Sequence, residues 1–153
     1  MKLPSLHLPR APLRLRRDGE GRVQVYDALR RRYVVLTPEE WVRQHFVHYL
    51  LSQLGYPSGL LSNEVGVEVG GVARRCDTVL FAREGMHPRL IVEYKAPQVP
   101  IGEEVFRQIQ SYNSVLRADY LIVSNGLKHY CCHIDYEKRQ LRFLPDIPRY
   151  EDL

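Results

Sequence analysis

The sequence predicts an α/β domain in which a mixed central β-sheet is flanked by helices. Two segments, 39–54 and 102–118, repeat apolar residues at helical spacing. Short runs rich in Val, Ile and Leu lie between and after them, in the order α, β, β, β, α, β and then further β. A length of 153 residues, 44% of them hydrophobic, suits one such domain.

The first 36 residues differ in composition from the rest. Residues 1–21 are rich in Pro and Arg, which predicts an irregular arm, and the alternating Val23 and Val25 predict a small hairpin or a strand packed on the body. Residues 1–32 carry nine Lys/Arg and three Asp/Glu, whereas residues 33–153 carry thirteen and fifteen. This asymmetry suggests a polyanion partner, with a solvated tail as an equal alternative. We therefore divide the chain into a basic arm with a short β element, 1–36, and an α/β domain, 37–153.

The first helix has a clear start and end. Thr37 is a suitable N-cap, Pro38 fits the first helical position, and Glu40 stands three residues after the cap, as in a capping box. Gly55 suits the position just past the helix. The apolar residues between them form one broad stripe, so we expect this helix to pack on the sheet.

The remaining elements follow from alternation and turn signals. Strands are expected in segments 63–70, 73–82 and 89–97, and the break at 84–88 makes the last two an antiparallel hairpin. The second helix begins with acidic residues, as the helix dipole favours. A buried strand is expected at 119–126, reached from the strand at 89 by a parallel crossover, and further strands at 129–136 and 140–145.

Charged residues stand where a strand should be apolar. Glu93 and Lys95 are two apart, so they share a sheet face with Ile91. If the hairpin turn centres near Gly85, Asp77 lies opposite Glu93, with β-carbons about 4.5–5.5 Å apart. Two buried carboxylates that close repel each other unless a cation lies between them, and a hard divalent ion such as Mg²⁺ fits two carboxylates and waters. The alternative is a solvent-exposed face, which a Glu-x-Lys taken alone would favour.

This order of helix, Asp, hairpin, Glu-x-Lys and helix resembles the PD-(D/E)XK nuclease superfamily, with Cys76-Asp77 in place of the Pro-Asp pair. A closer resemblance is to the N-terminal nuclease domain of the R subunit of type I restriction enzymes, over roughly residues 30–145. It is carried by LTPEEWVRQHF, RRCDTVLF, LIVEYKAP, VFRQIQSYN and YLIVSNG. The resemblance implies a restriction-endonuclease-like αβββαβ core. In that family the domain is fused to a motor; this sequence has no GxxxxGK[ST] loop, so we expect nuclease chemistry without a motor in this polypeptide.

The resemblance also implies roles for individual residues. Asp77 and Glu93 would hold Mg²⁺, for which Mn²⁺ can substitute, and Lys95 would orient or activate the attacking water. Gln108 and Tyr112 match the Q-x-x-x-Y element of RecB-like members. Because these two are four apart, they share one helical face, where they would hold the DNA backbone or the surroundings of Lys95.

Other residues give weaker signals. Glu40 resembles the acidic residue that completes the metal shell on the first helix of many such nucleases, although its capping role is an equal alternative. Gln44, one turn further on, is a second candidate for lining the site. Glu64 and Glu68 are expected on a solvated face. Residues 131–133, Cys-Cys-His, lack C-x-x-C spacing and are expected in the core rather than on zinc.

The sequence thus predicts a Mg²⁺-dependent DNA nuclease, and the alternative is a nuclease-like module that only binds nucleic acid or a partner. The basic residues expected to contact DNA are Arg14, Arg16, Arg17, Arg74 and Arg75. No run approaches the ~20 apolar residues of a membrane helix, so no membrane partner is expected. Three cysteines, two of them adjacent, do not make a disulfide framework, which favours a cytoplasmic location. A homodimer or a partner subunit is possible.

Overall fold

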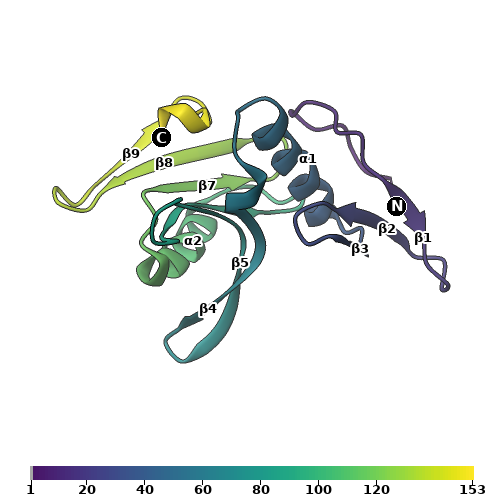
Figure 1. Ribbon diagram of the computed structural model, residues 1–153, viewed down its shortest axis with the longest axis horizontal. Helices are drawn as coiled ribbons and strands as arrows, with labels where there is room; N and C mark the ends of the chain where they lie inside the picture. Colours follow the sequence, from purple (N-terminus) through teal and green to yellow (C-terminus); the bar gives the residue numbers. More distant parts are fainter. Residues whose placement is uncertain (1) are drawn as a thin grey trace.

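The computed structural model describes residues 2–153 and contains two β-sheets and two α-helices (Figure 1). The small antiparallel sheet has the order β1 (Leu15–Arg17), β2 (Val23–Asp27), β3 (Arg32–Val35). The large sheet has the order β4 (Leu61–Val69), β5 (Val72–Phe81), β6 (Pro88–Tyr94), β7 (Tyr120–Ser124), β8 (His129–Asp135), β9 (Gln140–Leu144). The helices are α1 (Pro38–Ser52) and α2 (Glu103–Leu116), with short 3₁₀ turns at Ser58–Leu60 and Tyr150–Asp152.

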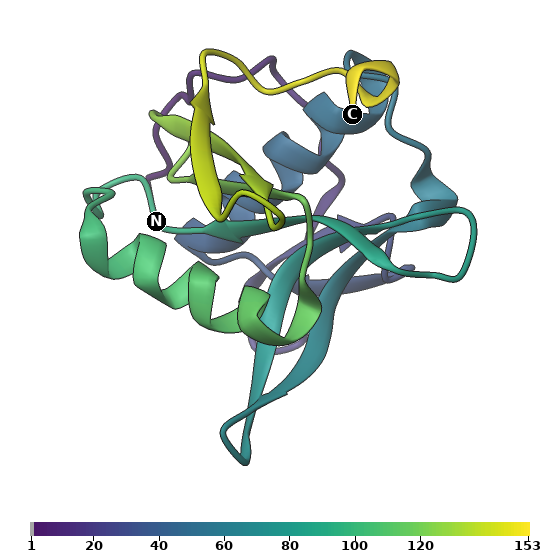
Figure 2. The same cartoon turned by 90° about the vertical axis from the view of Figure 1, so that its left-hand side faces the viewer.

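The large sheet is mixed, and the two helices cover its opposite faces (Figure 2). Only β6 and β7 pair in parallel, across the crossover that contains α2. On one face Phe46 of α1 packs in a cluster with Leu90 and Val92; on the other, Ile109 of α2 packs with Ile91. Because β6 is buried on both faces, its apolar residues are continuous rather than alternating with polar ones. The predicted α/β class and restriction-endonuclease-like arrangement are confirmed.

Helix α1 starts as its sequence predicts. The Thr37 hydroxyl accepts a hydrogen bond from the Glu40 backbone N–H at 3.1 Å, and Pro38 occupies the first turn. The Glu40 carboxylate does not return to the cap, so only half of the predicted capping box forms. The helix ends at Ser52, and Gly55 follows in the left-handed region at φ 76°.

The β5–β6 hairpin has the register inferred from its turn. Thr78 pairs with Val92 and Leu80 with Leu90, and the same offset brings Asp77 level with Glu93. The pairing ends at Thr78, so Asp77 lies where β5 begins to separate from β6. The other hairpin, β4–β5, extends beyond the rest of the sheet (Figure 1).

The N-terminal segment lies against the body instead of forming a free arm. The His7 backbone N–H donates to the Gly126 carbonyl at 2.8 Å, and the Trp41 indole donates to the Pro4 carbonyl at 2.9 Å. Leu6 and Leu8 pack against the core cluster to which α1 contributes. Residues 2–14 are irregular as predicted, but the end of the arm forms β1, and β2 and β3 form the predicted hairpin.

Two further expectations concern cysteines and membranes. Cys131 and Cys132 are buried thiols on β8, as the core interpretation predicts, and Cys76 is buried on β5. None of the helices within residues 2–153 is long and apolar enough to cross a membrane.

Candidate active site

The three residues singled out by their charge come together at the end of β6. The Asp77 carboxylate accepts a hydrogen bond from the Tyr94 backbone N–H at 2.8 Å, which takes the place of the next ladder bond. The Lys95 ammonium lies 3.8 Å from a Glu93 carboxylate oxygen. All of them line a cleft of about 420 Å³, which is bordered on its other side by the start of α1. The hairpin register and the end of the strand together create this grouping.

The surroundings of the Glu93 side chain disfavour its negative charge. Glu93 is only 4% exposed, and its Oε2 atom is buried without a hydrogen-bond partner. Burial, and then the neighbouring Asp77 charge, raise the pKa of Glu93 to about 9, although Lys95 opposes the shift. Burial likewise raises the pKa of Asp77, against the Tyr94 hydrogen bond and the Arg43 charge. Two such carboxylates with an unpartnered buried oxygen suit a divalent cation between them.

Residues of α2 fix the position of Lys95. The Lys95 ammonium donates to the side-chain oxygen Oε1 of Gln108 at 2.9 Å, and the side-chain nitrogen Nε2 of Gln108 donates to the Tyr112 hydroxyl at 3.1 Å. The Lys95 side chain is 26% exposed, so it also reaches the cleft. The Q-x-x-x-Y element therefore contacts Lys95, one of the two arrangements expected for it.

Arg43 is a cleft residue that the sequence reasoning missed. One guanidinium nitrogen lies 2.7 Å from Glu40 and 2.6 Å from Glu64, and the other donates to the Asp77 carbonyl at 2.8 Å. Burial opposes its charge, but the carboxylates outweigh this effect and raise the pKa of Arg43. Its spacing of three residues from Glu40 on one helix was the available signal.

Glu64 is the clearest correction to the sequence-based expectations. It was expected on a solvated face with Glu68, but Glu64 lies in the cleft and pairs with Arg43. Its φ of 59° is in the left-handed region, which interrupts the alternation of β4. On the neighbouring strand β5, Cys76 packs on the α2 side of the sheet, whereas Thr78 accepts a hydrogen bond from the Tyr94 hydroxyl on the α1 side. On both β4 and β5, therefore, the side chains switch from one face of the sheet to the other at the cleft.

Glu40 lines the same cleft but is already bound to cations. Its carboxylate contacts Arg30 at 2.5 Å as well as Arg43, and it accepts a hydrogen bond from Gln44. Gln44 also bonds Asp27 and does not line the cleft. Within residues 2–153 no three His, Cys, Asp or Glu side chains are grouped closely enough to hold a metal ion. In this arrangement Glu40 is a structural ion-pair residue, and its role as a metal ligand remains a prediction.

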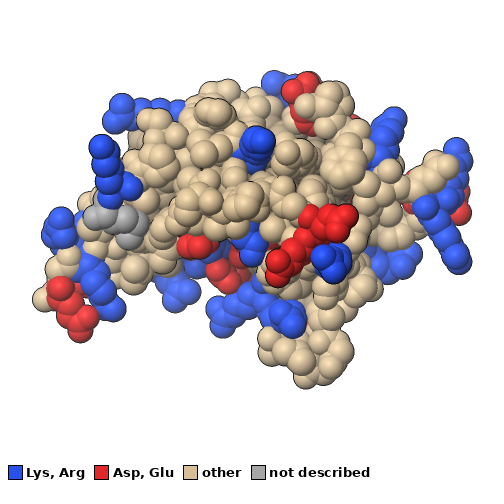
Figure 3. Space-filling view, turned by 180° about the vertical axis from the view of Figure 1, so that it is seen from behind, with Lys and Arg blue, Asp and Glu red and all other residues tan. Residues whose placement is uncertain are grey.

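The expected DNA-contacting arginines are all exposed. Arg14, Arg16 and Arg17 lie on or beside β1, and Arg74 and Arg75 lie on the β4–β5 hairpin, two and three residues before Asp77. Figure 3 shows Lys and Arg side chains at the end of the molecule that carries β1–β3, where some acidic side chains also lie, and again beside the β4–β5 hairpin, with further acidic side chains nearer the middle. The β4–β5 hairpin therefore contributes both cleft residues, Glu64 and Asp77, and two exposed arginines.

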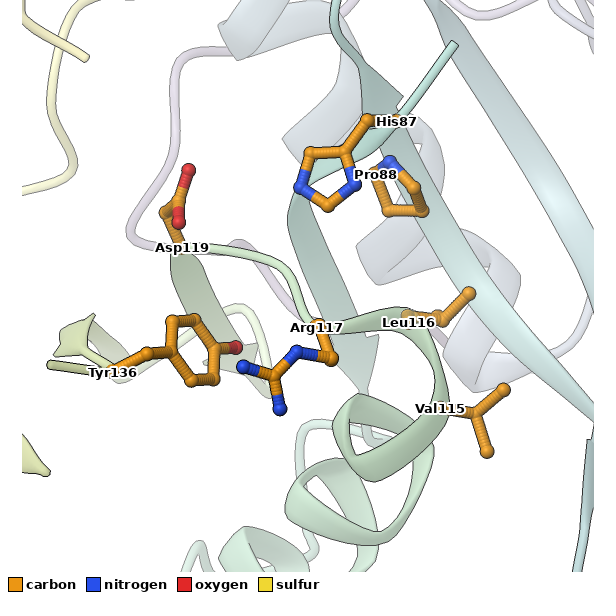
Figure 4. Close-up of a pocket in the computed structure, with 7 residues that line it drawn as sticks. All are labelled: His87, Pro88, Val115, Leu116, Arg117, Asp119 and Tyr136. Carbon is orange, nitrogen blue, oxygen red and sulfur yellow. The ribbon is translucent and has the colours of Figure 1, made fainter. Parts of the chain in front are cut away.

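A larger pocket of about 590 Å³ lies at the C-terminal end of α2 (Figure 4). Arg117 and Tyr136 line it, with the guanidinium carbon 4.4 Å from the ring centroid, and Asp119 lies at its edge. It contains none of the predicted site residues and no second carboxylate. The two acids and the lysine thus lie together in the smaller cleft and not in this pocket.

Comparison with known families agrees with this geometry. The model of the family described as the type I restriction enzyme R protein N terminus matches residues 38–148. The chain belongs to this family. The match runs from α1 to just beyond β9, so every cleft residue except Val35 and Thr37 lies within it, and the sheet β1–β3 lies before it. A comparison with curated proteins found no match.

The raised pKa of Glu93 predicts an unusual pH dependence of stability in the metal-free protein. Between the ordinary Glu pKa of 4.5 and about 9, folded Glu93 holds a proton that the unfolded chain lacks, so stability should fall as pH rises, by up to about 1.4 kcal/mol per pH unit for one proton. Glu93→Gln should remove the part of this slope that Glu93 contributes. Urea unfolding in EDTA at several pH values tests it, with Glu68→Gln, an exposed position, as the control. A wild-type stability that is flat or rises with pH over this range would contradict the expectation.

Proposed function

We propose that this domain is a Mg²⁺-dependent nuclease that hydrolyses phosphodiester bonds in DNA. The observation that carries the proposal is the pairing of Asp77 and Glu93 in one cleft beside Lys95, with Glu93 Oε2 buried and without a partner. A buried carboxylate oxygen of this kind is costly unless the site receives a proton or a cation. Membership of a restriction-enzyme family supports a nuclease role.

Asp77 and Glu93 would hold the metal ion, and Mn²⁺ can replace Mg²⁺ because both accept oxygen ligands. When bound, such an ion supplies Lewis-acid activation of the phosphate and of a water molecule. Asp77 can offer an oxygen while it keeps its bond to the Tyr94 backbone, and Glu93 offers Oε2. The two carboxylates thus have oxygen atoms free to bind a divalent metal ion.

The protein's own residues position the reactants. The Lys95 ammonium is held by Gln108 at one side and stands beside Glu93 at the other, so it can hold the attacking water and stabilise negative charge that develops on the phosphate. Tyr112 fixes Gln108 in turn. Arg43 neutralises Glu40 and Glu64 and holds the Asp77 main chain, which keeps the Asp77 carboxylate directed at the cleft.

The expected substrate contacts are electrostatic. Arg74 and Arg75 on the β4–β5 hairpin would bind phosphates close to Asp77, and Arg14, Arg16 and Arg17 would bind them further away. These contacts do not read sequence. One cleft would cut one strand of a duplex. A homodimer or a partner subunit could supply a second cleft for the other strand.

A second candidate function is a module of the same fold that binds nucleic acid or a partner without cleaving it. The lack of a third ligand grouped with Asp77 and Glu93 within residues 2–153 favours this reading. The intact acid pair speaks against it, because a module that only binds has no use for two neighbouring acids whose negative charges are costly without a bound cation.

Metal titration separates the two candidates. Calorimetry with Mn²⁺ and Mg²⁺ should show binding to the wild type and a loss of at least about tenfold in affinity for Asp77→Ala, the lower end of the losses seen even for second-shell changes. Asp152→Ala, at an exposed position, is the matched control. Circular dichroism and thermal unfolding verify that each variant is folded. Equal binding by the wild type and Asp77→Ala would contradict the proposed site.

A further inference from the structure

We propose that the outer face of the small sheet β1–β3 binds single-stranded nucleic acid by base stacking and leads the strand to the cleft. Binding by this face does not depend on the proposed nuclease function, whereas delivery of the strand to the cleft rests on that function.

The strand pairing sets which residues face outward. On β2, Val25 and Asp27 are buried against the body, so Gln24 and Tyr26 face away from it. The residues opposite these two lie on the same outer face: Arg14 and Arg16 from β1 and its approach, Tyr33 and Val35 from β3. Two arginines and two tyrosines therefore share one face of a sheet.

These four side chains form a continuous stacked row. The Arg14 guanidinium carbon is 4.5 Å from the centroid of the Tyr26 ring, and the Arg16 guanidinium carbon is 3.8 Å from that of Tyr33. The two rings meet edge to face at 5.2 Å. The Arg16 Nε atom also donates to Gln24 at 2.8 Å, which holds the guanidinium over the ring. The row is thus ordered before any ligand arrives.

The charges of this row are free for a ligand. Arg14 and Arg16 are exposed and form no ion pair within residues 2–153. The nearby acidic residues, Asp18 and Glu20, are instead paired with Arg22 in the β1–β2 turn. Fixed guanidinium groups combined with aromatic rings are what proteins use to bind phosphates and bases of single strands.

The same features favour a single strand over a duplex. In a duplex each base face is covered by its neighbours, so rings and guanidinium planes can stack only on unpaired bases. Val35 lies 43% exposed two residues after Tyr33, on the same outer face, and it also lines the cleft with Thr37. A strand laid along the row would therefore continue to the carboxylate pair. Because β1–β3 lie before residues 38–148, this face is an addition to the matched part of the chain.

Fluorescence anisotropy with labelled oligo-dT of about 15 nucleotides tests the stacking directly. An abasic oligonucleotide of the same length keeps the phosphates but removes the bases, and a blunt duplex is the third ligand. In EDTA, so that no cleavage occurs, the wild type should bind oligo-dT about tenfold more tightly than the abasic strand, the factor expected for one or two stacked bases.

Variants test whether the stacked arginines and tyrosines cause this roughly tenfold preference for oligo-dT. Tyr26→Ala with Tyr33→Ala should remove most of the preference for oligo-dT over the abasic strand, whereas Tyr26→Phe with Tyr33→Phe should keep it. Arg16→Ala should weaken binding of both ligands more than Arg139→Ala, an exposed charge on the distant β8–β9 turn. If the alanine pair fails to fold, the phenylalanine pair and the wild-type comparison still decide.

The outcomes distinguish this inference from the nuclease proposal. Equal wild-type affinity for oligo-dT and the abasic strand, or no binding of either, overturns stacking by this face whatever the cleavage result. Base-dependent binding without any Mg²⁺-dependent cleavage overturns the nuclease and keeps the binding face. If both hold, Tyr26→Ala with Tyr33→Ala should slow cleavage beside a single-stranded flap more than cleavage of blunt duplex; equal slowing overturns the delivery step.

Discussion

Replacing Lys95 by alanine should lower the rate of DNA cleavage by about 10²–10³-fold, the scale for removing one preorganised electrostatic donor. The Lys95 ammonium stands between Glu93 and Gln108, and in the proposed reaction it would face the charge that develops on the phosphate rather than a distant part of the DNA. An interaction that is stronger in the transition state than in the ground state changes the rate and leaves affinity nearly unchanged. The affinity for DNA in Ca²⁺, which occupies oxygen sites but supports little turnover, should therefore change far less.

The control for this variant is Lys128→Ala, because Lys128 lies in the loop between β7 and β8 and does not line the cleft. It should leave both the rate and the affinity near the wild-type values. A proportional loss of cleavage and Ca²⁺-supported binding in Lys95→Ala would show instead that Lys95 is a phosphate anchor. Gln108→Ala should reproduce part of the rate loss, since it removes the acceptor that positions the ammonium.

Replacing Asp27 by alanine should destabilise the fold by about 3–5 kcal/mol, the cost of breaking a buried ion pair by removing one partner. Asp27 is 1% exposed, and its carboxylate accepts hydrogen bonds from the backbone of Leu29 and Arg30 and from the side chains of Arg30, Gln44 and Asn63. Removing it leaves the Asn63 amide and the backbone N–H groups of Leu29 and Arg30 without their acceptor, whereas the side chains of Arg30 and Gln44 keep Glu40.

The pH dependence of this contribution has a definite sign. Burial raises the pKa of Asp27, but the hydrogen bonds from Arg30 and Asn63 outweigh burial and keep the pKa below its ordinary value of 3.8. The stabilisation is thus present above pH ~4 and is lost as pH falls through the lowered pKa. Urea unfolding at pH 7 measures the effect. Asp18→Ala removes a similar set of local hydrogen bonds in an exposed turn, where solvent can replace them, and it should cost much less stability than Asp27→Ala. Equal stabilities of the two variants would contradict the account.

Periodicity and turn chemistry were sufficient to predict the large sheet and its helices. The turn near Gly85 alone gave the β5–β6 register, and that register brings Asp77 level with Glu93. The charge of Glu93 was informative because both faces of β6 are covered by helices. The family resemblance added Gln108, which accepts a hydrogen bond from Lys95, and Tyr112, which in turn accepts one from Gln108.

The parts that the sequence did not predict depend on contacts between distant segments. Glu64 enters the cleft because one left-handed residue breaks the alternation of β4, and no periodicity marks such a residue. Arg43 meets Glu64 and the Asp77 carbonyl only after α1 has packed on the sheet. Likewise, the N-terminal segment is fixed by isolated hydrogen bonds of His7 and Trp41, which leave no repeating pattern in the sequence.

The central claim is that the Asp77–Glu93 pair supports metal-dependent hydrolysis of DNA. The most direct test incubates the wild-type protein with single-stranded, duplex and branched DNA in Mg²⁺ or Mn²⁺ and measures phosphodiester cleavage, with parallel reactions in EDTA and with Asp77→Asn. The account predicts cleavage of at least one substrate by the wild type with metal, and none above background in EDTA or with Asp77→Asn. No cleavage of any substrate under either metal, or equal cleavage by wild type and Asp77→Asn, would contradict it.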